Sequence, residues 1–285
     1  MAKPGQGKEV AMVSRFKGDC SLFDCPAVNA FLFHPRKASG PQPEIAGDTR
    51  LLPRDITIPV GEDGTIIGAK FHHSGDDSPV VLFFHGNGEI VADYDEIGGL
   101  YTSLGINFFP VDYRGYGKST GTPGVESMMA DCHTIFAFAK EWLRDNGYTG
   151  NVIVMGRSLG SASALELAAS NQQAIDGLII ESGFARVLPL LRLLGVDLEG
   201  EGIAEDSCFR NLEKAAHYDK PLLVIHAEYD HIIPFSDGRA LFDACPSAVK
   251  QFIKIENADH NTIFYYGIEP YMSAIKEFME LVDNG

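Results

Sequence analysis

Residues 151–168 read NVIVMGRSLGSASALELA. Residues 152–155 form a continuous apolar run, which is typical of a strand buried on both faces. The pentapeptide GRSLG follows directly, and after it comes a segment rich in Ala, Leu and Glu with helical periodicity. A strand, a G-x-S-x-G sequence and a helix in this order predict a nucleophile elbow, a sharp turn that presents its central serine.

The two glycines of the pentapeptide suit so tight a turn. Side chains at Gly156 and Gly160 would collide with neighbouring backbone, whereas glycine leaves room there. Ser158 is then expected to project from a strained turn. The helix that begins near Leu159 directs its N-terminal N–H groups and positive dipole end toward the same point. The alternative is a chance G-x-S-x-G in a glycine-rich chain, and the flanking strand and helix argue against it.

Apolar runs on both sides of the elbow predict strands that alternate with helices. The expected strands are residues 79–84, 106–111, 178–180, 222–225 and 251–255, and the expected helices are residues 126–146, residues 269–282 and one that ends near Leu104. Residues 55–60 and 68–72 are expected to form an antiparallel pair, because Asp63-Gly64 between them is a hairpin turn signal. This order predicts an α/β fold, with a mostly parallel central sheet covered by helices on both faces.

Polar clusters follow the predicted strands at their C-terminal ends. They read HGNGE from residue 85, DYRGYGKSTG from 112, ESGF from 181, HAEYD from 226 and ENADH from 256. Open α/β sheets place their sites at this edge. The clusters therefore predict one shared site.

Length and charge limit the organisation and the partners. The 285 residues contain no linker or repeat, so residues 51–285 are expected to form one domain, with residues 1–50 as an N-terminal extension. A formal net charge of −16 argues against a nucleic-acid or anionic-membrane surface. No apolar run reaches the ~18–20 residues that span a bilayer. No apolar segment of signal-peptide length begins the chain.

The five cysteines are odd in number and scattered along the chain. A Cys20–Cys25 metal pair lacks a second pair at finger-like spacing, so no metal site is expected. The preferred interpretation is reduced thiols in a cytoplasmic protein. No cofactor is expected either, because the chemistry of an activated serine needs none.

A serine hydroxyl needs a base, and the base needs an orienting carboxylate. In a G-x-S-x-G hydrolase these groups follow in the order Ser, acid, His. His260 follows the last strand and is the expected base, because His231 shares a loop with Asp230. Asp230 is favoured as the acid over Glu181, which also ends a strand.

Charge that develops on a carbonyl oxygen needs fixed donors. The backbone N–H groups of Asn87 and Leu159 are the candidates for such an oxyanion hole. His85 is interpreted as a structural brace of its loop, and Arg157 and Arg114 are interpreted as ion-pair partners of nearby carboxylates. Asp112 and Asp131 are expected to be structural.

From about residue 55 to 281 the chain resembles the α/β-hydrolase superfamily. The matching motifs are HGNG at His85, DYRGYGKSTG at Asp112, GRSLG at Ser158, AEYDHIIP around Asp230 and ADHN at His260. The chain is most similar to the serine-aminopeptidase and prolyl-oligopeptidase-like branch, which also holds acyl-protein thioesterases and esterases. The resemblance implies a catalytic triad of Ser158, His260 and Asp230, the same oxyanion hole, and an acyl-enzyme that water resolves.

Residues 184–212 lie where this fold commonly inserts a cap. They hold a dense leucine cluster and then an acidic stretch over residues 197–206, so they are expected to form either a lid over an acyl chain or a helix packed on the core. The substrate pocket is expected to include Gly86, Gly88, Leu188, Leu191 and Ile232.

The sequence is compatible with three functions. The first is a serine hydrolase that cleaves a carboxylic ester or thioester of a small or acyl substrate. The second is a serine peptidase or amidase, and the third is a non-catalytic binding protein on the hydrolase fold. Neither the acyl group nor the oligomeric state follows from the sequence.

Overall fold

The computed structural model describes residues 18–38, 52–196, 198 and 203–284. The strands are β1 Arg54–Val60, β2 Thr65–Phe71, β3 Val80–Phe84, β4 Asn107–Val111, β5 Val152–Arg157, β6 Gly177–Glu181, β7 Leu222–Ala227 and β8 Lys250–Ile255. The α-helices are α1 Pro26–Leu32, α2 Asp95–Ser103, α3 Val125–Asp145, α4 Gly160–Asn171, α5 Val187–Leu193, α6 Asn211–Ala215, α7 Phe235–Ala244 and α8 Ile263–Asp283. Four short 3-10 helices are η1 Cys20–Phe23, η2 Val91–Tyr94, η3 Gln172–Ala174 and η4 Glu205–Ser207.

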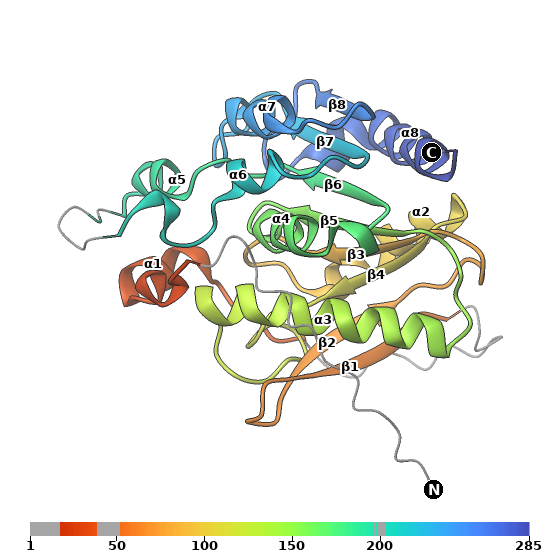
Figure 1. The fold of residues 1–285 in the computed structure, drawn as a ribbon, viewed down its shortest axis with the longest axis horizontal. Coiled ribbons are helices and arrows are strands. Elements are labelled where there is room, and N and C mark those ends of the chain that lie inside the picture. Colours follow the sequence, from red (N-terminus) through yellow and green to blue (C-terminus); the bar gives the residue numbers. More distant parts are fainter. Residues whose placement is uncertain (1–17, 39–51, 197, 199–202, 285) are drawn as a thin grey trace, which may run out of the picture.

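Within these residues the strands form one eight-stranded sheet in the order β1-β2-β4-β3-β5-β6-β7-β8. The pairs from β4-β3 to β7-β8 are all parallel, whereas β1 and β2 are antiparallel to each other and β2 is antiparallel to β4. Helices cover both faces of the sheet (Figure 1). The predicted α/β-hydrolase architecture is therefore confirmed.

Two apolar layers flank the sheet. The first holds buried side chains of β3, β5, α3 and α4, among them Phe84, Val154 and Phe136. The second holds buried side chains of the same strands that point the other way, together with those of α8, such as Phe278. The central strands are apolar throughout because both of their faces are covered.

The hairpin and the helices differ slightly from the sequence expectations. β1 and β2 pair antiparallel as predicted, and Gly64 in their turn has a φ of +76°. α8 begins at Ile263 rather than at residue 269, because its first turn joins the rest across a kink at Gly267. The sequence expectations did not include α1, α6 or α7, and α5 lies in the segment for which either a lid or a packed helix was expected.

The N-terminal segment, residues 18–38, packs beside the cap insert. α1 lies near α5 at one end of the molecule (Figure 1). A disulfide joins Cys20 to Cys208 across 188 positions, with the two Cα atoms 4.7 Å apart. The prediction of reduced thiols is therefore wrong for these two cysteines, since nothing in a sequence shows that two distant positions lie within disulfide reach. A cytoplasmic location stays a prediction.

Candidate active site

The elbow has the geometry that its glycines suggested. Ser158 lies between β5 and α4 with a φ of +51°, a left-handed conformation that costs an ordinary residue free energy. A Cβ atom on Gly156 would lie 2.3 Å from the carbonyl oxygen of Gly160, and one on Gly160 would lie 2.1 Å from the carbonyl oxygen of Phe84. The turn therefore excludes any side chain at both glycines.

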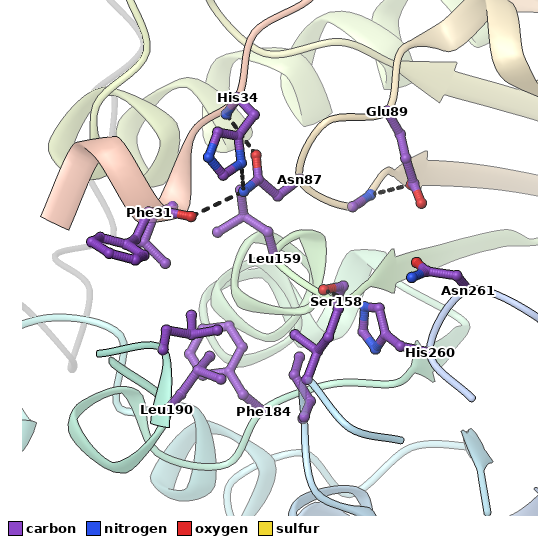
Figure 2. Close-up of a pocket in the computed structure, with 15 residues that line it drawn as sticks. Phe31, His34, Asn87, Glu89, Ser158, Leu159, Phe184, Leu190, His260 and Asn261 are labelled. Carbon is purple, nitrogen blue, oxygen red and sulfur yellow. Dashed lines mark hydrogen bonds between the residues drawn. The ribbon is translucent and has the colours of Figure 1, made fainter. Parts of the chain in front are cut away.

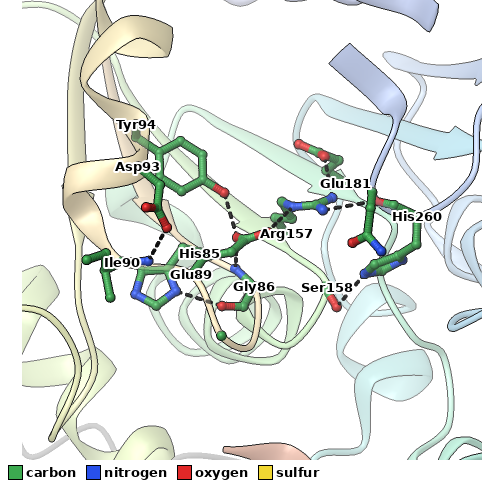
Figure 3. Close-up of polar contacts among 12 residues, drawn as sticks. His85, Gly86, Glu89, Ile90, Asp93, Tyr94, Arg157, Ser158, Glu181 and His260 are labelled. Atoms are coloured by element: carbon green, nitrogen blue, oxygen red, sulfur yellow. Dashed lines mark hydrogen bonds and ion pairs between the residues drawn. The ribbon is translucent and has the colours of Figure 1, made fainter. Parts of the chain in front are cut away.

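Ser158, His260 and Asp230 form a continuous chain of hydrogen bonds. The Oγ atom of Ser158 lies 3.0 Å from Nε2 of His260, and Nδ1 of His260 lies 2.7 Å from Oδ2 of Asp230. Figure 3 shows the first of these contacts. Ser158 and His260 are buried, and the Asp230 side chain is 0% exposed. Asp230 also accepts hydrogen bonds from the backbone N–H groups of Ile232 and Ile233.

The charge state of Asp230 follows from these partners. Burial alone would raise the pKa of its carboxyl group, but the bonds from His260 and from the Ile233 N–H hold that pKa below its usual value. Asp230 is therefore ionised at neutral pH and faces the imidazole as a carboxylate. This is the electrostatic arrangement that keeps a histidine ring oriented and stabilises its protonated form.

Glu181, the alternative acid, lies elsewhere. Its Oε1 atom is 2.7 Å from Nη1 of Arg157, and its Oε2 atom accepts a hydrogen bond of 2.8 Å from the Tyr271 hydroxyl. Asp259 accepts bonds from the next residues of its own loop instead of from the His260 ring. The structure therefore places Asp230 at the His260 ring, and it places neither Glu181 nor Asp259 there.

His226 is a neighbour of Asp230 that the sequence reasoning did not single out. Its Nε2 atom lies 3.0 Å from the carbonyl oxygen of Ile233 and 3.5 Å from Oδ2 of Asp230. Burial lowers the pKa of His226, so its ring is neutral and Nε2–H donates to Ile233. A signal was present in the sequence, because His226 opens the HAEYD cluster that holds Asp230.

The backbone N–H groups of Asn87 and Leu159 are the candidate oxyanion donors. Neither donates a hydrogen bond to another group in the described part of the chain. Both residues line the same pocket as Ser158. Leu159 also precedes α4, so the helix dipole adds positive potential at this point. Two unpaired amides beside a serine hydroxyl are suited to bind an oxyanion.

A buried ion network lies next to this site. Arg157 donates to Glu89 (2.8 Å), to Glu181 (2.7 Å) and to the carbonyl oxygen of His260 (2.9 Å). Glu89 in turn accepts bonds of 2.6 Å from the N–H of Gly86 and from the hydroxyl of Tyr94 (Figure 3). Arg157 thereby joins the loop after β3 to the loop that carries His260.

The same network sets the charge of Glu89. Burial raises the pKa of this carboxyl group, whereas Arg157 and the hydroxyl of Tyr94 lower it, and the net result is a pKa of about 2. The expectation that Arg157 pairs with nearby carboxylates is met. Its third bond, to the His260 carbonyl, was not expected.

A pocket of about 270 Å³ opens over Ser158. Figure 2 shows Phe31, Phe184 and Leu190 on one side of the serine and Asn261 on the other. The lining residues are Phe31, Leu32, His34, Gly86, Asn87, Glu89, Ser158, Leu159, Phe184, Leu190, Leu194, Ile232, Ile233, His260 and Asn261. The lining therefore comes from the N-terminal segment, the cap insert and the loops at the edge of the sheet.

Of the residues expected in the substrate pocket, Gly86 and Ile232 line this cavity, whereas Gly88, Leu188 and Leu191 do not. Leu190 of α5 and Leu194, the residue after that helix, line the pocket instead. Leu191 packs wholly in the core, and Leu188 packs against it. The insert thus serves partly as a pocket wall and partly as a core helix, because opposite faces of one short helix have different neighbours. Five of the ten positions of its acidic stretch, 197 and 199–202, lie outside the described residues.

The remaining predicted braces have structural partners. Nδ1 of His85 lies 2.8 Å from the Gly86 carbonyl, and Arg114 donates to both carboxylate oxygens of Asp131. Asp112 accepts a bond from the N–H of Val91. Among the described residues there is no cluster of three or more His, Cys, Asp or Glu that could hold a metal ion. No helix in the described ranges has both the length and the apolarity to cross a bilayer.

Comparison with known proteins gives relatives across most of the chain. The family model described as serine aminopeptidase, S33, matches residues 75–196. The human α/β hydrolase domain-containing protein 17B is 32% identical over 216 residues, which cover 71% of this chain and 67% of that protein. Protein bem46 of Schizosaccharomyces pombe is 31% identical over 195 residues, covering 66% of this chain and 63% of that protein.

Solved structures share the fold at lower identity. The Pyrococcus furiosus esterase Pf2001 superposes with a TM-score of 0.68 at 17% identity, covering 86% of this chain and 98% of that one. A soluble variant of monoglyceride lipase from Saccharomyces cerevisiae gives a TM-score of 0.63 at 18% identity, covering 85% and 98%. The sheet order, the elbow and these relatives agree, and the chain belongs to the α/β-hydrolase superfamily.

Proposed function

We propose that this protein is a serine hydrolase that cleaves carboxylic esters or thioesters by way of an acyl-enzyme. The observation that carries the proposal is the unbroken hydrogen-bond chain from Ser158 through His260 to Asp230. In this proposal His260 takes the proton of the Ser158 hydroxyl as the oxygen attacks the carbonyl carbon of the substrate. The Asp230 carboxylate stabilises the imidazolium that forms.

The tetrahedral intermediate carries a negative charge on the former carbonyl oxygen. The N–H groups of Asn87 and Leu159 are proposed to donate to this oxygen. His260 then gives its proton to the departing alkoxide or thiolate, which leaves the acyl group on Ser158. A water molecule, deprotonated by the same histidine, attacks the acyl-enzyme and releases the acid.

The pocket favours an ester or thioester over a peptide. Most of its lining side chains are apolar, which suits an acyl group. An aminopeptidase needs a carboxylate to hold the ammonium group of its substrate, and Glu89 is the carboxylate in the lining. Glu89 is already paired with Arg157 and Tyr94. The fold is shared with proteins named an esterase and a monoglyceride lipase, which supports the same choice.

The test is hydrolysis of p-nitrophenyl butyrate together with fluorophosphonate labelling and peptide mapping. Ser158→Ala is expected to lower kcat by about 10⁶-fold and to abolish labelling, because no other group can carry the acyl intermediate. Ser170→Ala, on the same helix and bonded to Glu166, is the matched control and keeps full activity. Turnover by Ser158→Ala at the wild-type rate would overturn the proposal. Aminoacyl-p-nitroanilides cleaved faster than esters would favour the peptidase instead.

A further inference from the structure

The N-terminal segment, residues 18–38, supplies one side of the pocket. Phe31, Leu32 and His34 all line it, and they come from α1 and the residues just after that helix. Leu32 is buried, whereas Phe31 is 42% exposed and lies at the rim. Figure 2 shows Phe31 on the side of the pocket opposite Leu190. Two segments that are far apart in the sequence therefore enclose the space beside the serine.

Apolar side chains gather on one side of the serine. Phe31, Leu190 and Phe184 lie on one side of Ser158, and Asn261 lies on the other (Figure 2). An acyl group bonded to Ser158 gains free energy when its hydrocarbon chain leaves water for an apolar surface. The chain of such a group is therefore directed between α1 and α5.

The segment is bonded to the loop that carries a candidate oxyanion donor. The side-chain Nδ2 of Asn87 donates to the carbonyl oxygen of Phe31 (3.1 Å) and to Nδ1 of His34 (2.9 Å). Its Oδ1 accepts a bond of 2.7 Å from the N–H of His34. Nε of Arg36 donates to the carbonyl oxygen of Gly88 (2.6 Å). The side chain of Asn87 is thus committed to holding the N-terminal segment beside the serine.

The beginning of the segment is attached to the cap insert. The Cys20–Cys208 disulfide makes the covalent link, and the rings of Phe23 and Phe209 pack edge to face with centroids 5.4 Å apart. Phe209 packs in the same way on Phe184, which lines the pocket. The insert, the segment and the pocket wall are therefore one connected unit.

The part of the N-terminal segment just before α1 is attached to α3. The carboxylate of Asp24 accepts bonds from the N–H groups of Val125 and Glu126, in the first turn of that helix. A carboxylate at a helix N-terminus satisfies free donors and meets the positive end of the dipole. The segment is thus fixed on both sides of α1.

We propose that residues 18–38 determine the acyl-chain specificity of the enzyme. Phe31 and Leu32 contact the acyl chain and set the length that the pocket accepts. The Cys20–Cys208 disulfide and the Asn87 side chain are positioning elements that keep this wall in place. The substrate class is an ester or thioester with an unbranched apolar acyl chain. This inference rests on the proposed hydrolase function, because it requires an acyl group on Ser158.

The first experiment measures kcat/KM for p-nitrophenyl esters from acetate to palmitate. Phe31→Ala is expected to lower kcat/KM about tenfold for the chain length that the wild type prefers, since a lost apolar contact is worth about this factor. The loss is expected to be smaller for the acetate ester than for the preferred chain length, because a shorter chain buries less apolar surface in the pocket. The matched control is Leu22→Ala, an exposed leucine of the same segment that does not line the pocket. An identical chain-length profile for Phe31→Ala and wild type would overturn the inference.

The second experiment tests the attachment. Cys20→Ser is expected to change the chain-length profile in the same direction as Phe31→Ala, while Cys25→Ser, which alters a free cysteine of the same segment, leaves it unchanged. Fluorophosphonate labelling of Ser158 in each variant reports whether the elbow is intact. If Cys20→Ser is labelled normally and keeps the wild-type chain-length profile, the disulfide has no part in positioning the pocket wall.

The two proposals fail in different ways. A wild-type protein that neither labels nor hydrolyses any ester would refute the hydrolase function itself. A wild-type protein that labels and hydrolyses esters, with a profile that Phe31→Ala leaves unchanged, would refute only the role of residues 18–38.

Discussion

Glu181 ends β6 and Asp230 follows β7, the neighbouring parallel strand, and the side chains of both are buried. Asp230 bonds to the ring of His260, whereas Glu181 bonds to Arg157 and Tyr271. One carboxylate therefore touches the histidine of the candidate triad, and the other belongs to an ion network beside it. A carboxylate at a strand end is therefore not a candidate catalytic group by position alone. The group that its side chain contacts is what separates Asp230 from Glu181.

The partners follow from where each residue lies relative to its strand. Glu181 is the last residue of β6 and pairs in register with Arg157, the last residue of β5. Paired positions on adjacent strands carry side chains on the same face of the sheet, so these two groups meet. Asp230 lies three residues beyond the end of β7, in a loop that is free of the sheet register and can reach the His260 ring.

The largest expected effect is on activity, when each carboxylate is replaced by the amide of the same shape. Asp230→Asn is expected to lower kcat by about 10⁴-fold, because an amide does not stabilise the imidazolium and favours the wrong tautomer of His260. Glu181→Gln is expected to keep kcat within about tenfold of the wild type. Steady-state hydrolysis of p-nitrophenyl butyrate measures both. A larger loss in Glu181→Gln than in Asp230→Asn would reverse the assignment.

The free energy of unfolding should rank the same two variants in the opposite order. Glu181→Gln removes a charge from a buried ion pair with Arg157 and is expected to cost about 4 kcal/mol. Asp230→Asn keeps an oxygen that can accept from the N–H groups of Ile232 and Ile233, and should cost about 1 kcal/mol. Urea unfolding followed by circular dichroism gives both values. Equal costs would show that the Arg157 network contributes no more than the triad does.

A smaller effect is expected from the charge of Glu89, which pairs with the same Arg157 as Glu181. The folded-state pKa of Glu89, about 2, lies below its ordinary value of 4.5, so its carboxylate stabilises the folded state above pH 4.5. This contribution, about 3 kcal/mol at most, is lost as the pH falls toward 2. The difference in unfolding free energy between wild type and Glu89→Gln is therefore expected to shrink between pH 6 and pH 3. A difference that stays constant over this range would contradict the pairing of Glu89 with Arg157.

The sequence alone was informative wherever the chemistry depends on local order. The apolar strands, the glycines around Ser158 and the position of His260 after the last strand can all be read along the chain. Asp230 and Glu181 could not be fully separated in that way, because both end strands and a strand end says nothing of which side chain it meets. Both fit the Ser, acid, His order, and the sequence favours Asp230 because residues 231–234 after it predict a loop that turns away from the sheet. The structure shows which carboxylate lies at the ring.

The pocket walls were the least predictable part. They depend on contacts between residues 18–38 and the cap insert, which leave no periodic signal in either segment. α5 is too short for its pattern to show which leucines face the pocket, and the sequence did not predict Leu190 or Leu194 there. The walls of the pocket thus depend on long-range packing, whereas the candidate triad follows from residues at or just after strand ends.

The disulfide between Cys20 and Cys208 also has a topological consequence. It closes a covalent ring that contains Ser158 and leaves Asp230 and His260 on the open C-terminal tail. Closing so long a loop lowers the entropy of the unfolded chain by an amount worth about 5 kcal/mol in the chain-entropy model. A single protease cut inside the ring opens it but keeps every residue of the candidate triad on one covalently connected molecule. A cut between residue 208 and Asp230 leaves the serine and its two partners on separate molecules.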